Sequence, residues 1–380
     1  MINSDILKAD VQLGLIIIVK LLIRLITATL VTVLVSSCVE PGSSISLEDL
    51  DPESSMAWGA TKFLEDDRFH SVSIAIYDQG KTYTGHFGEL TPGAGNTPSD
   101  LTLYELGSVS KLFNGTLAAK AVLEGRIKLD DKVTEYLANA PGNHRYKNLS
   151  YYDKPILVRH LLTHTSGFPN IISGLDSKET FFKELSQIEI SSVPGSNYSY
   201  SNTAPELMAY ILEVAYQRAY PELLEGLFLS LNMKDTSYRL DAKQKTRLIK
   251  GYNGSGELMP NLHSSLWGGS VGLHSTSRDL IEFMRFQLEN PNKPSNESRR
   301  ELYSINSDYA VAYFWQSVRE KEAVSYRHHG GIYGMQNWLM VYPEHGIGIS
   351  VISNVSFNGV GNRLERLSND LLSDLLRLRE

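Results

Sequence analysis

Ser108 and Lys111, in the stretch YELGSVSKLFNG, have the residue types and the spacing of a nucleophile and its base. The residues that follow, as far as about Glu124, are almost continuously apolar and predict a buried helix that Gly125 ends. Ser108 then lies in the first turn, where unpaired backbone N–H groups stabilise an anion, and Lys111 lies one turn later on the same face. Burial disfavours the ammonium form, so Lys111 would accept the serine proton. The structural alternative makes Ser108 a helix cap and lets Lys111 reach solvent.

A second polar pair, Tyr200 and Asn202 in SNYSYSNTAPELMAY, precedes a helix that we expect from about Pro205. In such a turn a tyrosine hydroxyl is able to pass a proton between the serine and a leaving group. An asparagine amide is able to hold a substrate carbonyl. Packing and turn formation are the alternative roles of an isolated Y-x-N.

The third stretch is RHHGGIYG, in which two histidines and three glycines adjoin a core strand. Neighbouring residues of a strand point to opposite faces, so His328 and His329 are poor joint ligands, and we expect no metal and no cofactor. Gly330, Gly331 and Gly334 weaken strand pairing but allow another backbone to approach closely. They favour a substrate that lies along this strand edge.

The elements that position these residues follow from the apolar patterns. Alternation predicts hairpins over residues 71–90 and 337–354, and leucines at helical spacing predict a helix from Arg363 to Arg377. Strands from both ends of the chain are therefore expected to pair in one antiparallel sheet that helices cover. Residues from about 109 to 255 are mostly helical in pattern, which predicts a helical region between the two ends.

Bulk properties narrow the classes of function. The chain of 380 residues has a net charge of −7 and no long basic run, which argues against a nucleic-acid partner. Hydrophobic residues make up 42% of the chain, which is ordinary for a globular protein. The single cysteine, Cys38, excludes an internal disulfide.

The N-terminal segment predicts export. Lys20 and Arg24 flank the apolar run LITATLVTVLV, and VSSC follows, which resembles the lipobox of bacterial lipoproteins. We therefore expect a signal peptide over residues 1–37, lipidation of Cys38, a polar tether over 38–57 and a location on the membrane, facing the periplasm or the cell exterior. A transmembrane anchor from Leu13 to Val35 is the alternative, but the two charges inside it disfavour spanning.

Taken in order, these stretches resemble the penicillin-recognising serine hydrolases, in the branch that holds class C β-lactamases, D-alanyl-D-alanine carboxypeptidases and related esterases. The family pattern S-x-x-K matches Ser108 and Lys111, Y-x-N matches Tyr200 and Asn202, and the third box matches the segment from His328 to Gly330. The stretch LLTHTSGFP is a further hallmark of this branch. The resemblance covers residues from about 58 to the end.

The resemblance implies a fold and a set of roles. The fold is the α+β β-lactamase-like fold: an antiparallel sheet flanked by helices, with a helical subdomain of about residues 114–255 inserted and the active site in the cleft between them. Ser108 would be the acylated nucleophile, Lys111 its base partner and Tyr200 the proton relay. Asn202 would orient a small-molecule or peptide substrate, and the third-box residues His328, His329, Gly330 and Gly331 would bind it. The backbone N–H groups of Ser108 and Gly331 would form the oxyanion hole.

The third box departs from the lysine and threonine of typical class C β-lactamases, because His328 and His329 stand there. This favours the peptidase and esterase members; a true class C β-lactamase and a non-catalytic binding or sensor homologue are the alternatives. A histidine has a reference pKa near 6.5, so we expect carboxylate-bearing substrates to bind more weakly as the pH rises from about 5.5 to 8. A non-catalytic homologue would be expected to lose the serine, the lysine or the tyrosine, and the chain keeps all of them.

Overall fold

The computed structural model describes residues 50–142, 144–170, 177–190, 192–262, 266–289, 293–320 and 323–380. The expected signal peptide, the alternative anchor and Cys38 lie outside these residues, so they stay predictions. The expected tether and the structure differ at residues 52–57, which form the first turns of helix α2 (Pro52–Leu64). Asp51 caps this helix and proline occupies its first position, both of which favour a helix start. In the described part of the chain, no helix has the length and apolarity needed to cross a membrane.

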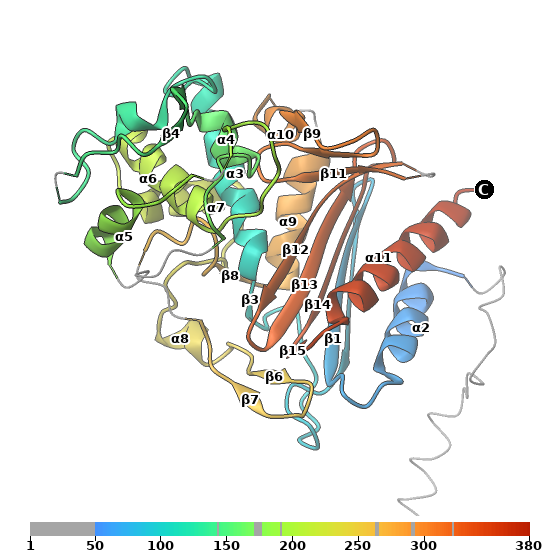
Figure 1. The fold of residues 1–380 in the computed structure, drawn as a ribbon. Coiled ribbons are helices and arrows are strands. Elements are labelled where there is room, and N and C mark those ends of the chain that lie inside the picture. Colours follow the sequence, from blue (N-terminus) through green and yellow to red (C-terminus); the bar gives the residue numbers. More distant parts are fainter. Residues whose placement is uncertain are drawn as a thin grey trace, which may run out of the picture. The chain divides into compact units, whose positions relative to one another are not determined.

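An antiparallel sheet lies at the centre of the described residues, which contribute eight strands to it (Figure 1). The strand order is β2-β1-β14-β13-β12-β11-β10-β9. The bounds are β1 Ser71–Asp78, β2 Lys81–Gly88, β9 Tyr303–Ser304, β10 Tyr309–Val311, β11 Gln316–Arg319, β12 Val324–Ile332, β13 Met335–Tyr342 and β14 Ile347–Ser353. Strand β1 pairs with β14, so the two ends of the chain meet in one sheet. The predicted hairpins and the predicted pairing of the chain ends are confirmed.

Helices cover both faces of the sheet. Helix α2 and helix α11 (Val360–Arg377) lie side by side on one face (Figure 1). Helix α9 (Ser277–Leu288) packs against β1 and β14 from the other face. The alternation along β1 shows the two faces, because Ile74 and Ile76 join the core under α2 and α11 while Ala75 and Tyr77 join the larger core. The predicted C-terminal helix is confirmed and begins three residues earlier than expected, at Val360 rather than Arg363.

The helical region lies between β2 and α9 in the sequence. Its helices are α3 Ser110–Leu123, α4 Val158–Leu162, α5 Lys178–Leu185, α6 Thr203–Tyr216, α7 Tyr220–Ser230 and α8 Ala242–Lys245. Short turns η1 Gly107–Val109 and η2 Val133–Tyr136 and the short strands β3 Tyr104–Glu105, β4 Ser150–Tyr151, β5 Lys154–Pro155, β6 Gly251–Asn253, β7 Leu258–Met259 and β8 His274–Ser275 connect them. Helix α10 (Lys293–Ser298) and strand β15 (Val355–Ser356) complete the described elements. The prediction of a mainly helical insertion is confirmed for the residues described.

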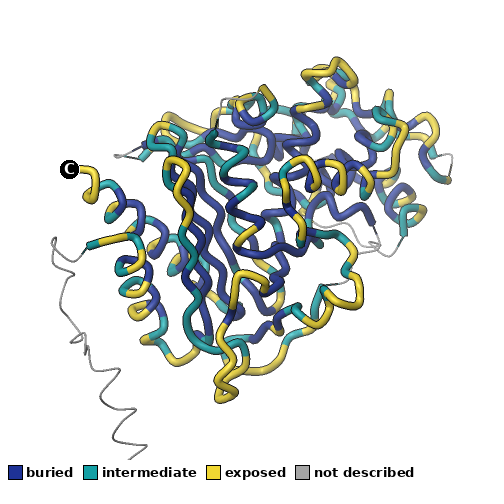
Figure 2. Tube along the Cα trace, turned by 180° about the vertical axis from the view of Figure 1, so that it is seen from behind, coloured by how far each residue is buried: buried dark blue, intermediate teal, exposed yellow. Residues whose placement is uncertain are grey.

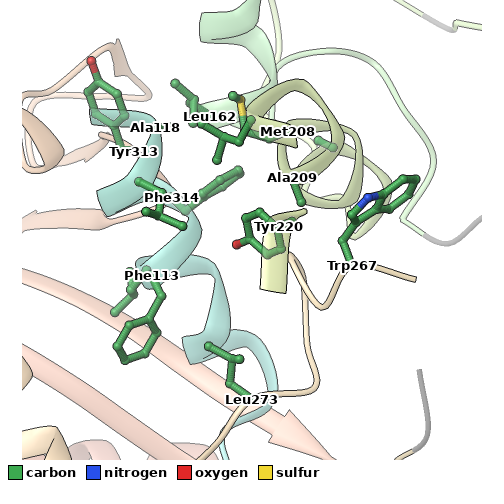
Figure 3. Packing of buried hydrophobic residues seen from close by; sticks show 14 of the residues in the cluster. Phe113, Ala118, Leu162, Met208, Ala209, Tyr220, Trp267, Leu273, Tyr313 and Phe314 are labelled. Carbon is green, nitrogen blue, oxygen red and sulfur yellow. The ribbon is translucent and has the colours of Figure 1, made fainter. Parts of the chain in front are cut away.

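Helix α3 runs through the larger core. Figure 3 shows buried side chains around α3: Met208 of α6 and Tyr220 of α7 lie on one side of the helix, and the ring of Phe113 points away from them toward the sheet. Each of these side chains is buried, as are most residues of α3. Figure 2 shows buried residues in dark blue through the interior and exposed residues in yellow along the outer loops. Phe113 and Phe283 of α9 lie with ring centroids 4.3 Å apart, which ties the helical region to the helix on the sheet. The core therefore fixes the position of α3 and of the residues at its N-terminal end.

Candidate active site

Ser108 lies in the short turn η1, immediately before α3, and not inside the helix as predicted. Its side chain is half-buried, whereas Lys111 in the first turn of α3 is fully buried. Gly107 has a φ of 52°, and a Cβ added to it would lie 3.0 Å from the backbone nitrogen of Gly331. Only glycine satisfies both the left-handed backbone and this close approach. Ser108 is therefore held at the point where α3 meets the end of β12.

Lys111 has three polar partners. Its Nζ lies 3.0 Å from Ser108 Oγ, 2.7 Å from Asn202 Oδ1 and 2.8 Å from the carbonyl oxygen of Ser270. Burial lowers the pKa of Lys111 from 10.5 to about 7, and the negative charge of Glu206 opposes this shift. A substantial share of the molecules therefore carries a neutral amine at neutral pH. The predicted burial of the lysine is confirmed, and the alternative in which it reaches solvent is wrong.

The partners of Lys111 define where its lone pair points when the amine is neutral. Both Asn202 Oδ1 and the Ser270 carbonyl are acceptors only, so they take the two N–H donors of the neutral amine. The lone pair then faces Ser108, which donates its hydroxyl proton along this contact. A neutral Lys111 in this place is a base aimed at the serine.

Tyr200 completes the hydrogen bonding of the serine. Its hydroxyl donates to Ser108 Oγ at 2.7 Å. Burial raises the pKa of Tyr200 to about 12, so the phenol keeps its proton at neutral pH. Ser108 Oγ thus accepts from Tyr200 and donates to the neutral Lys111. Of the two neighbours, the neutral lysine is placed to accept the serine proton, and the tyrosine donates a hydrogen bond.

Tyr200 and Asn202 are held by the segment that follows α4. The Ser201 hydroxyl accepts from two backbone N–H groups at the start of α6 and donates to the carbonyl of Pro169. Asn170 holds Asn202 in place. The backbone N–H of Asn202 donates to the Asn170 carbonyl oxygen, and the side-chain amide of Asn202 donates to Asn170 Oδ1. Asn202 was expected to orient the substrate. In this structure its side-chain oxygen, Oδ1, accepts a hydrogen bond from Lys111.

The end of β12 lies against the turn that carries Ser108. A Cβ added to Gly330 would lie 2.2 Å from the carbonyl oxygen of Leu106, so the predicted close backbone approach is confirmed. Gly331 is exposed and follows directly. Its backbone nitrogen borders Gly107, the residue before Ser108. The two N–H groups expected to form an oxyanion hole are thus carried by adjoining segments.

His328 differs from the expectation. Its side chain is 2% exposed, and its Nδ1 lies 2.7 Å from the carbonyl oxygen of His329. Burial, together with the nearby Lys111, lowers the pKa of His328 to about 3. His328 is therefore neutral from pH 5.5 to 8, and the predicted titrating anchor for a carboxylate is wrong. The sequence gives no measure of this burial.

His329 points to the other face of β12, as predicted for neighbouring strand residues. Its ring packs 5.1 Å from that of Trp338, and its Nε2 lies 3.1 Å from Gln336 Oε1. The two histidines are therefore on opposite sides of the strand, and His329, which was expected to bind the substrate, lies on the face turned away from Ser108. In the described ranges, no group of three or more His, Cys, Asp or Glu side chains is placed to hold a metal ion.

Two groups of the site were missed in the sequence. His164, in LLTHTSGFP, is buried with a φ of 55°, and its ring lies 4.6 Å from that of Tyr200. A positive φ at a residue other than glycine marks strain that the surroundings maintain. The carbonyl of Ser270 is the second group, and as part of the main chain it leaves no residue-type signal. The position of His164 in a family hallmark was the signal that could have identified it.

The fold and the arrangement around Ser108 define a class of protein in which a buried lysine and a tyrosine flank a serine between a sheet and a helical region. Comparison with known proteins agrees with this class. The family model described as Beta-lactamase matches residues 60–372. The chain belongs to the Beta-lactamase family.

The individual relatives have low sequence identity to this chain. Protein flp of Staphylococcus aureus (strain MRSA252) is 25% identical over 328 residues, which are 82% of this chain and 64% of that protein. A protein of Providencia stuartii named Beta-lactamase is 28% identical over 232 residues, or 60% of this chain and 57% of that protein. The chain thus spans less than two thirds of the length of these relatives. The structure of a β-lactamase/D-alanine carboxypeptidase from Yersinia pestis, complexed with citrate, has a TM-score of 0.76 at 22% identity and covers 86% of this chain and 98% of its own. That likeness confirms the fold.

Proposed function

We propose that this protein is a serine hydrolase that cleaves ester or amide bonds through an acyl-enzyme on Ser108. One observation carries the proposal: Ser108 Oγ lies 3.0 Å from Lys111 Nζ and 2.7 Å from the Tyr200 hydroxyl. The lysine is buried and its other two partners are acceptors, so its neutral form is directed at the serine proton. Membership of the Beta-lactamase family supports the reaction class.

The proposed reaction has two halves. In the first, Lys111 takes the hydroxyl proton of Ser108 while Oγ forms a bond to the substrate carbonyl carbon. The backbone N–H groups of Ser108 and Gly331 stabilise the oxyanion. The bond to the leaving group then breaks, and the leaving group receives the proton from Lys111 by way of the Tyr200 hydroxyl. In the second half, water attacks the ester on Ser108, the same groups move its proton back to Oγ, and the acid product leaves.

The substrate class follows from the charges around the serine. His328 carries no charge at neutral pH, so the third box offers no cation to a substrate carboxylate. The binding of neutral esters and amides does not depend on such a cation. Penicillins and D-Ala-D-Ala peptides carry a carboxylate, which has no charged partner at His328. We propose that neutral acyl substrates are preferred. The names of the Yersinia and Providencia proteins make D-alanyl peptides and β-lactams the substrates to compare with them.

A substrate panel tests the proposal. Purified protein is incubated with a nitrophenyl ester, a penicillin and a D-Ala-D-Ala peptide, and turnover is compared for wild type, Ser108→Ala and Ser110→Ala. Ser110 is the matched control, because it is a serine two residues away whose hydroxyl only accepts from the backbone N–H of Leu273. Turnover of the ester by wild type and Ser110→Ala, with none by Ser108→Ala, supports the proposal. Equal turnover by Ser108→Ala, or none by wild type, contradicts it, and the second result favours a binding or sensor homologue.

We also propose that the protein is exported and lipidated at Cys38. The support is the sequence alone: a charged flank, an apolar run and VSSC occur in the order of a lipoprotein signal. Mass spectrometry of protein extracted from membranes should find a mature N-terminus at Cys38 that carries acyl chains. A mature protein that retains residues 1–37 would contradict this.

A further inference from the structure

Glu206 is a buried carboxylate that the proposed reaction does not use. It lies in the first turn of α6 and is 2% exposed. Its Oε1 accepts from the backbone N–H of Ser270 at 2.8 Å and from the hydroxyl of the same residue at 2.5 Å. Its Oε2 accepts from the backbone N–H of Trp267 at 3.2 Å. A carboxylate placed among several donors in the interior needs a structural or a functional reason.

One residue connects this carboxylate to the base. The carbonyl oxygen of Ser270 accepts from Lys111 Nζ at 2.8 Å, while the amide and hydroxyl of Ser270 donate to Glu206. Glu206 thus fixes the backbone N–H and the side chain of Ser270, the residue whose carbonyl holds the lysine. If this carbonyl moved, the amine would have a free N–H, and its lone pair would no longer be directed at Ser108.

The hydrogen bonds indicate that Glu206 is ionised. Burial raises its pKa, and the donors from Ser270, Trp267 and Gly269 oppose that shift. A backbone N–H only donates, so these partners favour the carboxylate over the acid. The negative charge of Glu206 then acts on Lys111 and favours its ammonium form.

Four other titratable side chains of the described residues face Glu206 and Lys111. His164 comes from the segment after α4, Tyr200 from the turn before α6, Tyr220 from helix α7 and His328 from strand β12. Burial lowers the pKa of both histidines and raises the pKa of both tyrosines. All four side chains are therefore neutral near pH 7. In the described part of the chain, Glu206 supplies the formal charge that faces the lysine.

We propose that Glu206 is a positioning residue for Lys111: it fixes the Ser270 carbonyl that holds the amine and places a negative charge behind it. The inference rests on the proposed function of Ser108 and Lys111, and adds a group that sets the pH at which the base becomes available. Glu206 does not touch the serine, so its effect passes through Ser270 and through the field at Lys111.

Glu206→Gln separates the charge from the packing. The glutamine keeps the shape and one acceptor oxygen but removes the negative charge that favours the ammonium form. The pKa of Lys111 should fall by about one unit, because removal of an adjacent opposite charge has effects of this size. In a plot of kcat/KM against pH, the fall in activity on the acidic side (the acid limb) should move to lower pH by the same amount. Glu206→Asp retains the charge and should keep the limb near its wild-type position.

The matched control is Glu213→Gln, two turns further along the same helix. Glu213 accepts from the indole N–H of Trp267 and from Lys178, but makes no contact with Ser270 that links it to the base. Thermal melting of all variants checks that each is folded. The limb should stay in place in Glu213→Gln and shift only in Glu206→Gln. If Glu206→Gln does not fold, Ser270→Ala, which removes one donor to the carboxylate, must alter the limb for the proposal to stand.

A second readout makes the test independent of turnover. Protein with 13C-labelled lysine is titrated by NMR, and the Lys111 signal is assigned by its loss in Lys111→Met. A lower pKa of this signal in Glu206→Gln, with no change in Glu213→Gln, supports the inference. An unchanged pKa overturns it, even when the enzyme is active. A wild type without hydrolysis or labelling of Ser108 would instead overturn the proposed function, and the NMR titration would still decide the role of Glu206.

Discussion

Helices α3 and α11 illustrate two different uses of a helix in one domain. Helix α11 buries a stripe of leucines against the sheet and leaves Arg366 and Arg377 exposed, which is the pattern of a covering helix. Helix α3 is buried on most of its surface and nonetheless carries Lys111 inside the core. The first arrangement stabilises the fold. The second places a charge where it costs free energy, and we attribute that cost to the chemistry of Ser108.

The largest expected effect is that of Lys111→Met. The methionine fills the same space but removes the base, so kcat/KM should fall by several orders of magnitude, as loss of a coupled catalytic group does. The free energy of unfolding at pH 7 should rise, because a buried amine with a lowered pKa is replaced by an apolar group. Kinetics and thermal melting measure the two changes.

The pH dependence of that gain in stability has a definite sign. Lys111 has a pKa of about 7 in the folded state and 10.5 as a reference, so the unfolded chain binds more protons between these values. Wild-type stability therefore rises with pH over this window, and the advantage of Lys111→Met shrinks toward pH 10. Lys120→Met, at an exposed lysine of the same helix, is the control and should change neither quantity. A Lys111→Met variant that stays active would remove the distinction between the two helices.

Leu371→Ala tests the covering helix. Leu371 is 1% exposed in the core between α11 and the sheet, so the truncation leaves a cavity and should cost about 2–5 kcal/mol of unfolding free energy. Urea denaturation measures the loss. The folded fraction should keep the wild-type acid limb, because this core lies on the face of the sheet opposite α9. A shifted limb would show that the two regions are coupled.

The smallest effect is expected at His328. Because its pKa is lowered to about 3, it carries no charge from pH 5.5 to 8. We expect the acid limb of the pH profile to come from Lys111, whose pKa is lowered to about 7. The KM-against-pH profiles for a charged and a neutral substrate should therefore be parallel. The substitution His328→Asn should leave the pH profile of each substrate unchanged. A rise in KM with pH for the charged substrate alone, absent in His328→Asn, would restore the role expected from the sequence.

The sequence predicted the parts of the fold that repeat a simple pattern. Alternation gave the hairpins of residues 71–90 and 337–354, and leucine spacing gave α11, because each pattern reflects burial on one face. The resemblance to the serine hydrolases brought Ser108, Lys111 and Tyr200 together correctly, although they come from separate segments. Local periodicity alone does not predict that meeting.

The errors concern groups whose environment comes from distant segments. His328 looked like a titrating residue because the packing of Tyr200 and His164 near it leaves no trace in the strand sequence. Glu206 looked like an ordinary helix residue, since its partners lie in the loop that contains Ser270. Its place in the apolar run TAPELMAY was the only local signal. Burial and hydrogen bonding of polar groups are set by tertiary structure, so local sequence does not predict them.

Covalent trapping of the nucleophile tests the central claim most directly. Wild-type protein is treated with a fluorophosphonate at pH 8, digested and analysed by mass spectrometry, with Ser108→Ala and Ser110→Ala treated in parallel. We predict one adduct, on Ser108, which persists in Ser110→Ala, is absent from Ser108→Ala, and forms more slowly as the pH falls through about 7, where Lys111 gains its proton. An adduct on another residue, or undiminished labelling of Ser108→Ala, would contradict the account.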